Sequence, residues 1–343
     1  MRIEGEKMTS IRSFPTTRMR RLRAYSWSRD LVRENRLAVE DLIYPVFVTD
    51  EPSTSTISTM PGIKRFSFDE CIKECERAAQ LGIKAVALFP KISDQLKSPD
   101  GIEALNTDSL VPKLIRTLKS TIPNMGIIAD VALDPYTSHG QDGIIDKSGE
   151  IINDVTVAQL AKQAAVLAAA GADIVAPSDM MDGRIGIIRI ALDKAGFERT
   201  MILSYAAKYA SCFYGPFRDA VGSAKSLAGK SKSTYQMDSG NSDEAMHEVA
   251  LDLQEGADIV MVKPGMPYLD IIHRIKSRFE APVFAYQVSG EFAMIQYASQ
   301  HNALDLKSAV LESLMAFKRA GSDAILTYFA LDAAQWIKES YQP

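Results

Sequence analysis

The stretch Glu255-Gly-Ala-Asp-Ile-Val-Met-Val-Lys263 decides the fold. Its glycine ends a helical pattern, where a helix C-cap requires left-handed backbone, and the apolar run after it is typical of a buried strand. Similar steps from a helical pattern through a glycine to an apolar run occur at Gly82, Gly171 and Gly321. A unit of this kind that recurs along a chain predicts a parallel sheet in which helices and strands alternate.

Apolar runs of this type occur eight times, and helical patterns separate most of them. The predicted strands are 43–48, 85–89, 126–131, 173–176, 201–205, 258–262, 282–288 and 324–328. Helical patterns are plainest at 68–81, 155–170, 242–255 and 304–320, and Ser242 with two following acids is a good helix start. Eight strands that alternate with helices predict an α/β protein with a (β/α)8 barrel, and a doubly wound open sheet is the alternative.

Composition narrows the class of protein. The chain has 343 residues, of which 46% are hydrophobic and 24% charged, so it can bury a large core. A net charge of -4 argues against a general nucleic-acid binder, and no apolar stretch is long enough to predict a membrane span. Three cysteines are too few for a disulfide framework and fit a reducing compartment, so we expect a cytoplasmic protein. Cys71 and Cys75 are expected to be ordinary thiols of a helix rather than metal ligands.

The N-terminal segment differs from the rest. Residues 8–29 are rich in Arg and Ser, as in an organelle transit peptide, but Glu4 and Glu6 precede them and no apolar h-region is present. The competing interpretation, which we prefer, is a basic arm that docks on a partner subunit. We therefore divide the chain into an arm, residues 1–38, and a catalytic barrel, residues 39–343.

Lysines stand at the ends of two of the apolar runs, Lys208 after the fifth and Lys263 after the sixth. An ammonium is costly to bury unless it is paired or its pKa falls, and a lysine with a lowered pKa is a nucleophile that forms Schiff bases with carbonyl substrates. Two lysines in one pocket would each disfavour the protonation of the other. The alternative is that each lysine lies just past its strand and reaches water.

Other polar residues also follow strands. Asp130, Ser178, Ser289 and Tyr328 all fall where a predicted strand ends. In a (β/α)8 barrel the catalytic groups come from these ends and from the loops after them, so this convergence favours a functional interpretation.

The loop after the third strand, residues 130–142, is rich in charge. It holds the carboxylates of Asp130, Asp134 and Asp142 together with His139, a set that would suit a metal or acid–base chemistry. An ordinary polar loop remains the alternative.

A polar segment, residues 222–234, follows the fifth strand and is rich in Gly, Ser and Lys. It is typical of a lid whose Lys225, Lys230 and Lys232 clamp an anionic substrate, although a solvated surface loop is the other interpretation. Residues 224–231 approximate a phosphate-binding loop. They have Ala at the first Gly position and no strand before them, so nucleotide binding is not expected.

At this level of detail the chain resembles the porphobilinogen synthase family, also called 5-aminolevulinate dehydratase. The resemblance runs from about Arg20 to the C-terminus. It rests on Asp130-Val-Ala-Leu-Asp-Pro-Tyr-Thr-Ser-His-Gly, Ala176-Pro-Ser-Asp-Met-Met-Asp-Gly-Arg, Ser204-Tyr-Ala-Ala-Lys-Tyr-Ala-Ser, Tyr235-Gln-Met-Asp, Met261-Val-Lys-Pro-Gly-Met-Pro-Tyr-Leu-Asp and Tyr286-Gln-Val-Ser-Gly-Glu.

The resemblance implies a (β/α)8 barrel, a homo-octamer with an embracing N-terminal arm, and a lyase (a hydro-lyase) of haem and other tetrapyrrole biosynthesis. Such an enzyme condenses two molecules of 5-aminolevulinate to porphobilinogen with loss of two waters. By resemblance, Lys263 forms a Schiff base with the substrate that becomes the propionate side, and Ser289 and Tyr328 hold the carboxylate of that substrate. Lys208 engages the second, acetate-side substrate.

The remaining site residues also come from the resemblance. Arg218, Lys232 and Gln236 match the clamp on the carboxylate of the second substrate, and Asp130 and Ser178 match groups around its amine.

The family's zinc-dependent form has cysteines where this chain has Ala132, Asp134 and Asp142. Thiolates hold Zn²⁺ tightly, and two carboxylates with an alanine do not replace them. We therefore expect no zinc in the active site and a place in the magnesium-responsive branch, in which Asp134 and Asp142 are active-site carboxylates. Glu248 matches the position that binds an allosteric Mg²⁺ through a mostly hydrated shell.

Two other functions stay open from the residues alone. A class I aldolase-like barrel needs one lysine, so the second lysine and the lid cations argue against it. A catalytically inactive barrel that serves as a binding module is disfavoured because Lys208 and Lys263 are both intact.

Overall fold

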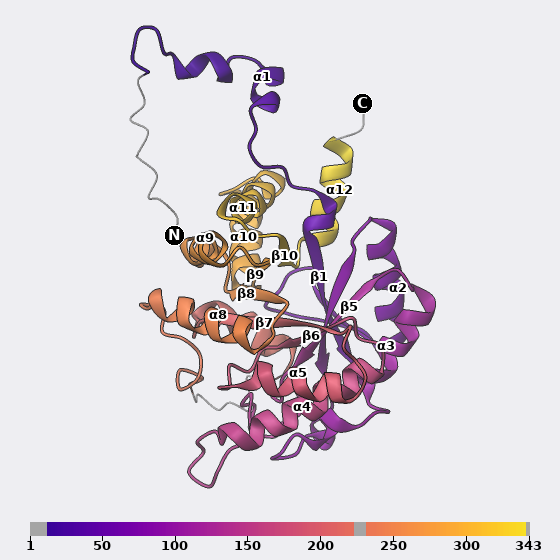
Figure 1. Cartoon of the computed structure of the whole chain (residues 1–343). Coiled ribbons are helices and arrows are strands. Elements are labelled where there is room, and N and C mark those ends of the chain that lie inside the picture. The colour runs from indigo at the N-terminus through magenta and orange to yellow at the C-terminus, as the bar shows by residue number, and fades with distance from the viewer. Residues whose placement is uncertain (1–11, 223–230, 341–343) are drawn as a thin grey trace. The chain divides into compact units, whose positions relative to one another are not determined.

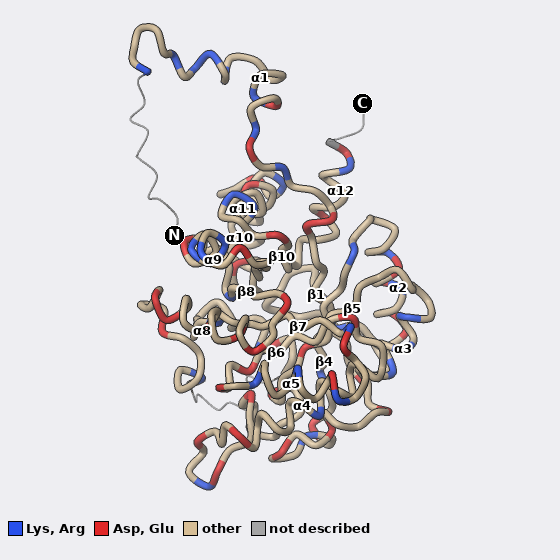
Figure 2. The backbone as a smooth tube through the Cα atoms, in the orientation of Figure 1, with Lys and Arg blue, Asp and Glu red and all other residues tan. Residues whose placement is uncertain are grey.

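The computed structural model describes residues 12–222 and 231–340, which fall into two compact units, residues 1–36 and residues 37–343. The described part of the first unit contains the 3-10 helix η1 (Met19–Arg23) and the short helix α1 (Ser26–Leu31). Figure 2 shows basic positions recurring along it.

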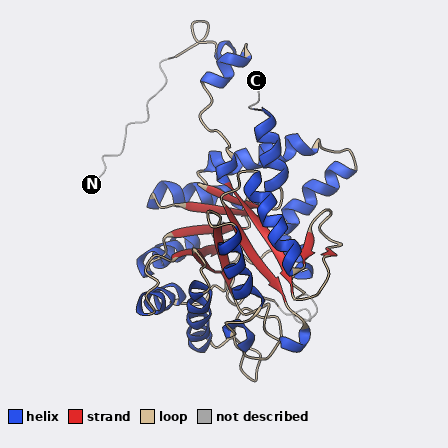
Figure 3. Ribbon diagram, turned by 90° about the vertical axis from the view of Figure 1, so that its right-hand side faces the viewer, coloured by secondary structure: helices blue, strands red, loops and turns tan. Residues whose placement is uncertain are grey.

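The second unit is a closed barrel of eight parallel strands surrounded by helices (Figures 1 and 3). Each strand pairs in parallel with the next, and the last pairs with the first, which confirms the (β/α)8 prediction and excludes an open sheet. The strands are β1 (Leu42–Thr49), β4 (Ala85–Lys91), β5 (Gly126–Val131), β6 (Ile174–Pro177), β7 (Met201–Lys208), β8 (Ile259–Lys263), β9 (Val283–Gln287) and β10 (Ala324–Thr327).

Helices follow most of these strands. They are α2 (Phe68–Gln80), α3 (Leu110–Thr121), α4 (Asn153–Ala169), α5 (Arg184–Lys194), α6 (Gly215–Ala220), α8 (Asp243–Glu255), α9 (Leu269–Phe279), α10 (Ser289–Gln300), α11 (Leu306–Ala320) and α12 (Ala330–Ser340). Two short strands, β2 (Ser55–Thr56) and β3 (Lys64–Phe66), extend the sheet beside β1. Among the described residues, no helix has the length and apolar character needed to cross a bilayer.

The glycine repeat has the backbone that was predicted. Gly82, Gly171, Gly256 and Gly321 adopt φ values of +86°, +104°, +108° and +111°, which favour glycine because a Cβ is strained there. Each reverses the chain between a helix and the strand that follows.

Three copies of this repeat carry an aspartate two residues after the glycine, and the structure explains it. Asp173 accepts a hydrogen bond from the backbone N–H of Ile127 at 2.8 Å, which ties the start of β6 to the start of β5. Asp258 accepts from Ile202 and Asp323 from Val283, each at 2.7 Å. The aspartates therefore satisfy N–H groups at the amino ends of neighbouring strands, the end opposite to the predicted site.

Several local predictions need correction. The strand predicted at 201–205 continues to Lys208, with a register irregularity between Ser204 and Ala207. Ser242 precedes α8, but its side chain makes no cap and instead accepts a hydrogen bond from Arg274 at 2.6 Å. The prediction for Cys71 and Cys75, by contrast, is confirmed, since both are free thiols buried in helix α2.

Candidate active site

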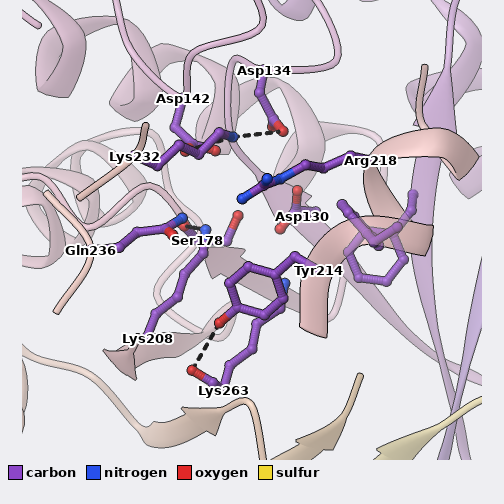
Figure 4. A pocket seen from close by; sticks show the side chains of 12 residues that line it. Asp130, Asp134, Asp142, Ser178, Lys208, Tyr214, Arg218, Lys232, Gln236 and Lys263 are labelled. Carbon is purple, nitrogen blue, oxygen red and sulfur yellow. Dashed lines mark hydrogen bonds and ion pairs between the residues drawn. The ribbon is translucent and has the colours of Figure 1, made fainter. Parts of the chain in front are cut away.

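A cavity opens at the carboxyl ends of the barrel strands (Figure 4). Its volume is about 30 Å³, which leaves room for about one water molecule beside the side chains that fill it. It is lined by Phe89, Asp130, Asp134, Asp142, Ser178, Lys208, Tyr214, Phe217, Arg218, Lys232, Gln236 and Lys263. Nine of these twelve residues were predicted as site residues from the sequence, although they come from segments far apart in the chain.

Lys208 and Lys263 are direct neighbours, since they pair in register as the last residues of β7 and β8. Both are 5% exposed, so neither side chain reaches bulk water as the alternative interpretation required. Adjacent strands lie about 4.8 Å apart, so two amines enter the cavity from neighbouring positions.

Aromatic rings surround the Lys263 amine. Its Nζ lies 5.1 Å, 5.2 Å, 4.9 Å and 5.0 Å from the ring centroids of Tyr205, Tyr214, Phe217 and Tyr286. Burial first, and repulsion from Lys208 second, lower the pKa of Lys263 to about 7. A large fraction of this side chain is therefore a neutral, nucleophilic amine at neutral pH.

The Lys208 amine has a different environment. Its Nζ donates a hydrogen bond to the backbone carbonyl of Ser178, in the loop after β6, and lies 6.0 Å from the centroid of Tyr205. Ser178 thus contributes its carbonyl to Lys208, while its hydroxyl interacts with Asp130.

Asp130 supplies a carboxyl group that can exchange a proton near neutral pH. Burial, followed by the negative charge of Asp134, raises the pKa of Asp130 to about 7, although Lys263 and Lys208 act in the opposite direction. Its Oδ1 is buried without a hydrogen-bond partner. The carboxyl is therefore suited to take or give a proton beside the amines.

The other two carboxylates of the loop hold a lysine rather than each other. Lys232 Nζ lies 2.9 Å from Asp142 Oδ2 and 3.3 Å from Asp134 Oδ2 (Figure 4). Burial opposes the ionisation of Asp142, but Lys232, Lys208 and a hydrogen bond from Tyr235 lower its pKa to about 2. Burial and the charge of Asp142 raise the pKa of Asp134 despite Lys232. The Lys232 ammonium therefore bridges the carboxylates of Asp134 and Asp142.

Arg218 and Gln236 complete the predicted clamp. Figure 4 shows the Arg218 side chain extending from α6 into the middle of the cavity. Gln236 is 4% exposed, and its Oε1 has no hydrogen-bond partner. Arg218 and Lys232 supply positive charge and N–H donors, and the amide N–H₂ of Gln236 is a further donor, a combination that suits a carboxylate ligand.

Ser289 and Tyr328 do not line the cavity, although sequence reasoning placed them in the site. Ser289 Oγ accepts from the N–H of Phe217 at 2.9 Å and donates to the carbonyl of Phe213 at 3.3 Å. Tyr328 OH is bonded to Tyr286 OH at 2.8 Å. Both side chains are buried, Tyr328 against one of the rings around Lys263 and Ser289 against the backbone of the segment that carries another.

His139 takes no part in the cavity. Its Nδ1 accepts from the N–H of Gln141 at 3.2 Å, and its Nε2 faces the carbonyl of Pro99 at 3.0 Å. Among the described residues no group of three or more His, Cys, Asp or Glu side chains has a geometry that would hold a metal ion. Of the expected lid, Lys225 and Lys230 lie outside the described residues, as does most of the segment that resembles a phosphate-binding loop.

The rings around Lys263 were missed from the sequence. Tyr214 and Phe217 belong to an aromatic-rich stretch just after β7, and that density was the available signal. Tyr205 and Tyr286 lie inside strands, where an aromatic residue reads as ordinary core.

Glu248 lies in a second hollow of about 450 Å³, with polar walls. Burial, then Asp252 and Asp182 against the opposing charge of Arg184, raises the pKa of Glu248 to about 7. The positive charge near the Glu248 carboxylate is too small to offset its burial and the neighbouring acids. The hollow has room for an ion with its water shell. The residues present therefore fit a hydrated Mg²⁺, which prefers few protein ligands.

Comparison with known proteins gives a consistent result. A family model described as delta-aminolevulinic acid dehydratase matches residues 16–336. The delta-aminolevulinic acid dehydratase of Bradyrhizobium diazoefficiens is 55% identical over 322 residues, which cover 94% of this chain and 91% of that protein. The protein of the same description from Rhodobacter capsulatus is 50% identical over 325 residues, covering 94% and 97%.

A solved structure is similar throughout. The delta-aminolevulinic acid dehydratase (porphobilinogen synthase) of Toxoplasma gondii, in complex with the reaction product porphobilinogen, superposes with a TM-score of 0.93 at 51% identity. The match covers 94% of this chain and 92% of that one.

Proposed function

This chain belongs to the delta-aminolevulinic acid dehydratase family, and from that premise we propose how its residues condense two molecules of 5-aminolevulinate to porphobilinogen with loss of two waters. The activity is that of a lyase, porphobilinogen synthase. The observation that carries the proposal is the pair of buried, register-matched lysines in one cavity.

Lys263 begins the chemistry on the first substrate. Its neutral amine attacks the ketone carbon, the carbonyl oxygen leaves as water, and a C=N bond to the lysine remains. Asp130 is suited to move the protons of this step, because its pKa of about 7 lets it act as acid and as base. Lys208 engages the ketone of the second substrate from the neighbouring strand.

Substrate carboxylates are held at two places. Arg218, Lys232 and Gln236 receive the carboxylate of the second substrate, and the positive charge and N–H donors that they supply support this role. Lys232 then divides its charge between that carboxylate and its two aspartates. Ser289 and Tyr328 receive the first carboxylate, which requires the neighbouring rings to move, because the cavity has room for about one water.

Metal dependence follows from the donor atoms. Ala132, Asp134 and Asp142 offer no thiolate, and the two carboxylates already share the Lys232 ammonium, so we propose that the active site uses no zinc. Mg²⁺ would bind at Glu248 through its water shell, outside the cavity, and would stabilise the active assembly instead of contacting substrate. We therefore propose that the chain is of the magnesium-responsive branch.

We propose a cytoplasmic homo-octamer in which the first unit docks on a neighbouring copy. In support, large apolar side chains of this unit are exposed, among them Phe14 at 74%, Trp27 at 61% and Leu31 at 76%. Such a set is unusual for a free surface and typical of an interface. The buried free thiols of Cys71 and Cys75 fit a reducing compartment.

The decisive experiment is to incubate the protein with 5-aminolevulinate and to assay the pyrrole product, with and without a chelator. We expect turnover by the parent and by Lys194→Ala, an exposed control on α5, but none by Lys263→Ala. Borohydride reduction with substrate present should leave an adduct on Lys263. No pyrrole from the parent, or an adduct only at other lysines, would contradict the proposal.

A further inference from the structure

Arg184 is the largest fully buried side chain of the described chain and does not line the active-site cavity. It is 2% exposed at the start of α5. A buried guanidinium is costly unless every contact is well placed, and exchange of such a network for apolar residues is often neutral or stabilising. Stability alone is therefore a weak explanation for this residue.

One side of the guanidinium holds strand β7. Its Nη1 and Nη2 donate to the carboxylate of Asp252 on α8 at 3.3 Å and 3.2 Å. Nη2 also lies 3.2 Å from Ser204 Oγ, and Ser204 donates to the same carboxylate. Ser204 is a residue of β7, so its hydroxyl links the strand to the ion pair between Arg184 and Asp252.

Ser204 is also where β7 loses its regular register. The pairing with β8 shifts between Ser204 and Ala207 and resumes with Lys208 opposite Lys263. An irregularity of this kind redirects the side chains that follow it. The direction in which Lys208 enters the cavity therefore depends on how Ser204 is held.

The other side of the guanidinium holds the loop after β6. Its Nη1 donates to the carbonyl of Met181 at 3.2 Å, and its Nε lies 3.7 Å from Asp179 Oδ2. Asp179 in turn accepts from the N–H of Met181 at 2.8 Å. The residue before Asp179 is Ser178, whose carbonyl accepts the hydrogen bond from Lys208.

We propose that Arg184 is a positioning residue for Lys208. One guanidinium holds both features that set the position of the Lys208 amine. These are the strand irregularity that directs its side chain and the loop whose carbonyl accepts its hydrogen bond. The inference rests on the proposed function, because it assigns Lys208 a substrate to meet. Lys263 lies on β8 and is not a partner in the ion pairs of Arg184, and its link to this part of β7 is the ring of Tyr205 beside Ser204. The network therefore acts mainly on Lys208.

Ser204→Ala tests the link to β7, because it removes the hydroxyl and keeps the ion pair. Ser322→Ala is the matched control, since Ser322 is also a buried, hydrogen-bonded serine. It lies at the amino end of β10, and its hydroxyl donates to backbone carbonyls. We expect both variants to unfold at nearly the same temperature. Ser204→Ala should lower kcat about tenfold, as expected for a misplaced reacting group. It should change the rate at which 4-oxopentanoate and borohydride modify Lys263 much less than it changes kcat, because Lys208 keeps its charge near that amine.

Arg184→Lys provides a second variant, which keeps the charge but cannot bridge both sides of the network. We expect this variant to reduce kcat at least as much as Ser204→Ala does. The rate of Lys263 modification should again change much less than kcat. The proposal would be overturned if the rate of Lys263 modification fell as much as kcat. It would also be overturned if kcat fell no more than it does in Ser322→Ala. A parent protein that neither turns over substrate nor forms the Lys263 adduct would instead refute the proposed function.

Discussion

The lowered pKa of Lys263 depends on a neighbour that can be removed. Lys208→Met keeps the length of the side chain and takes away its charge. Two unit charges at the spacing of adjacent strands, about 5 Å, repel by roughly 3 kcal/mol at an effective dielectric constant of about 20, which corresponds to about two pKa units. Burial remains in the variant, so the pKa of Lys263 should rise from about 7 but stay below its ordinary value of 10.5.

The consequence is a loss of neutral amine. With a pKa of about 7, roughly 70% of Lys263 is neutral at pH 7.4, and a rise of two units would lower that fraction roughly thirtyfold. The assay is the initial rate of the Lys263 adduct with 4-oxopentanoate and borohydride, measured from pH 6 to pH 10 by peptide mass. Parent protein should inflect near pH 7 and Lys208→Met clearly higher, while the surface control Lys194→Met follows the parent. An unchanged or lower inflection in Lys208→Met would refute the reasoning.

Three further predictions concern the carboxylates and metals. Asp142→Asn should lower the free energy of unfolding by about 3 kcal/mol in urea denaturation, because Lys232 loses its nearer buried partner. Asp146→Asn, in the exposed part of the same loop, should lower it clearly less. The pKa of Asp142 is depressed in the folded state, so the difference between parent and Asp142→Asn should persist above about pH 4 and shrink as pH falls toward 2. Active protein should contain no tightly held, required Zn²⁺ when its metals are measured by mass spectrometry; one Zn²⁺ per site that is needed for turnover would contradict this. Glu248→Ala should lose stimulation by Mg²⁺ and keep adduct formation at the Schiff-base lysine, while the exposed control Glu312→Ala responds like the parent; a variant that still responds would place the ion elsewhere.

The barrel could be predicted because its signals are local. A glycine in left-handed backbone followed by a β-branched run needs no distant partner to be recognised, and the strand at Gly126–Val131 has the predicted bounds. The carboxyl ends of parallel strands must meet at one end of the barrel, so polar residues at those ends were expected together. This argument brought Asp130, Ser178, Lys208 and Lys263 into one cavity.

Features that depend on tertiary contacts were not accessible in the same way. Ala206-Ala-Lys208 was left out of the predicted strand, since alanines favour strands weakly, and pairing with β8 keeps these residues extended. The short strand β3 pairs with the end of β1 that extends past its pairing with β10, and β2 pairs with β3, so neither strand could be recognised without β1. Ser242 and the two acids after it were predicted as a helix start, and α8 does begin at Asp243, but the Ser242 hydroxyl accepts from Arg274 on α9 instead of capping the helix.

The direction of a side chain is the least predictable property, and the site depends on it. Ser289 and Tyr328 lie at strand ends as expected, yet their hydroxyls bond to Phe213 and Tyr286 and do not line the cavity. The rings around Lys263 lower the polarity at its amine, and burial is the first cause of its low pKa. A site that opened fully to receive the first carboxylate would hydrate this amine and return its pKa toward 10.5. If the first carboxylate binds at Ser289 and Tyr328 as we propose, the rings must shift without admitting bulk water to the amine, and binding there is then joined to the reactivity of Lys263.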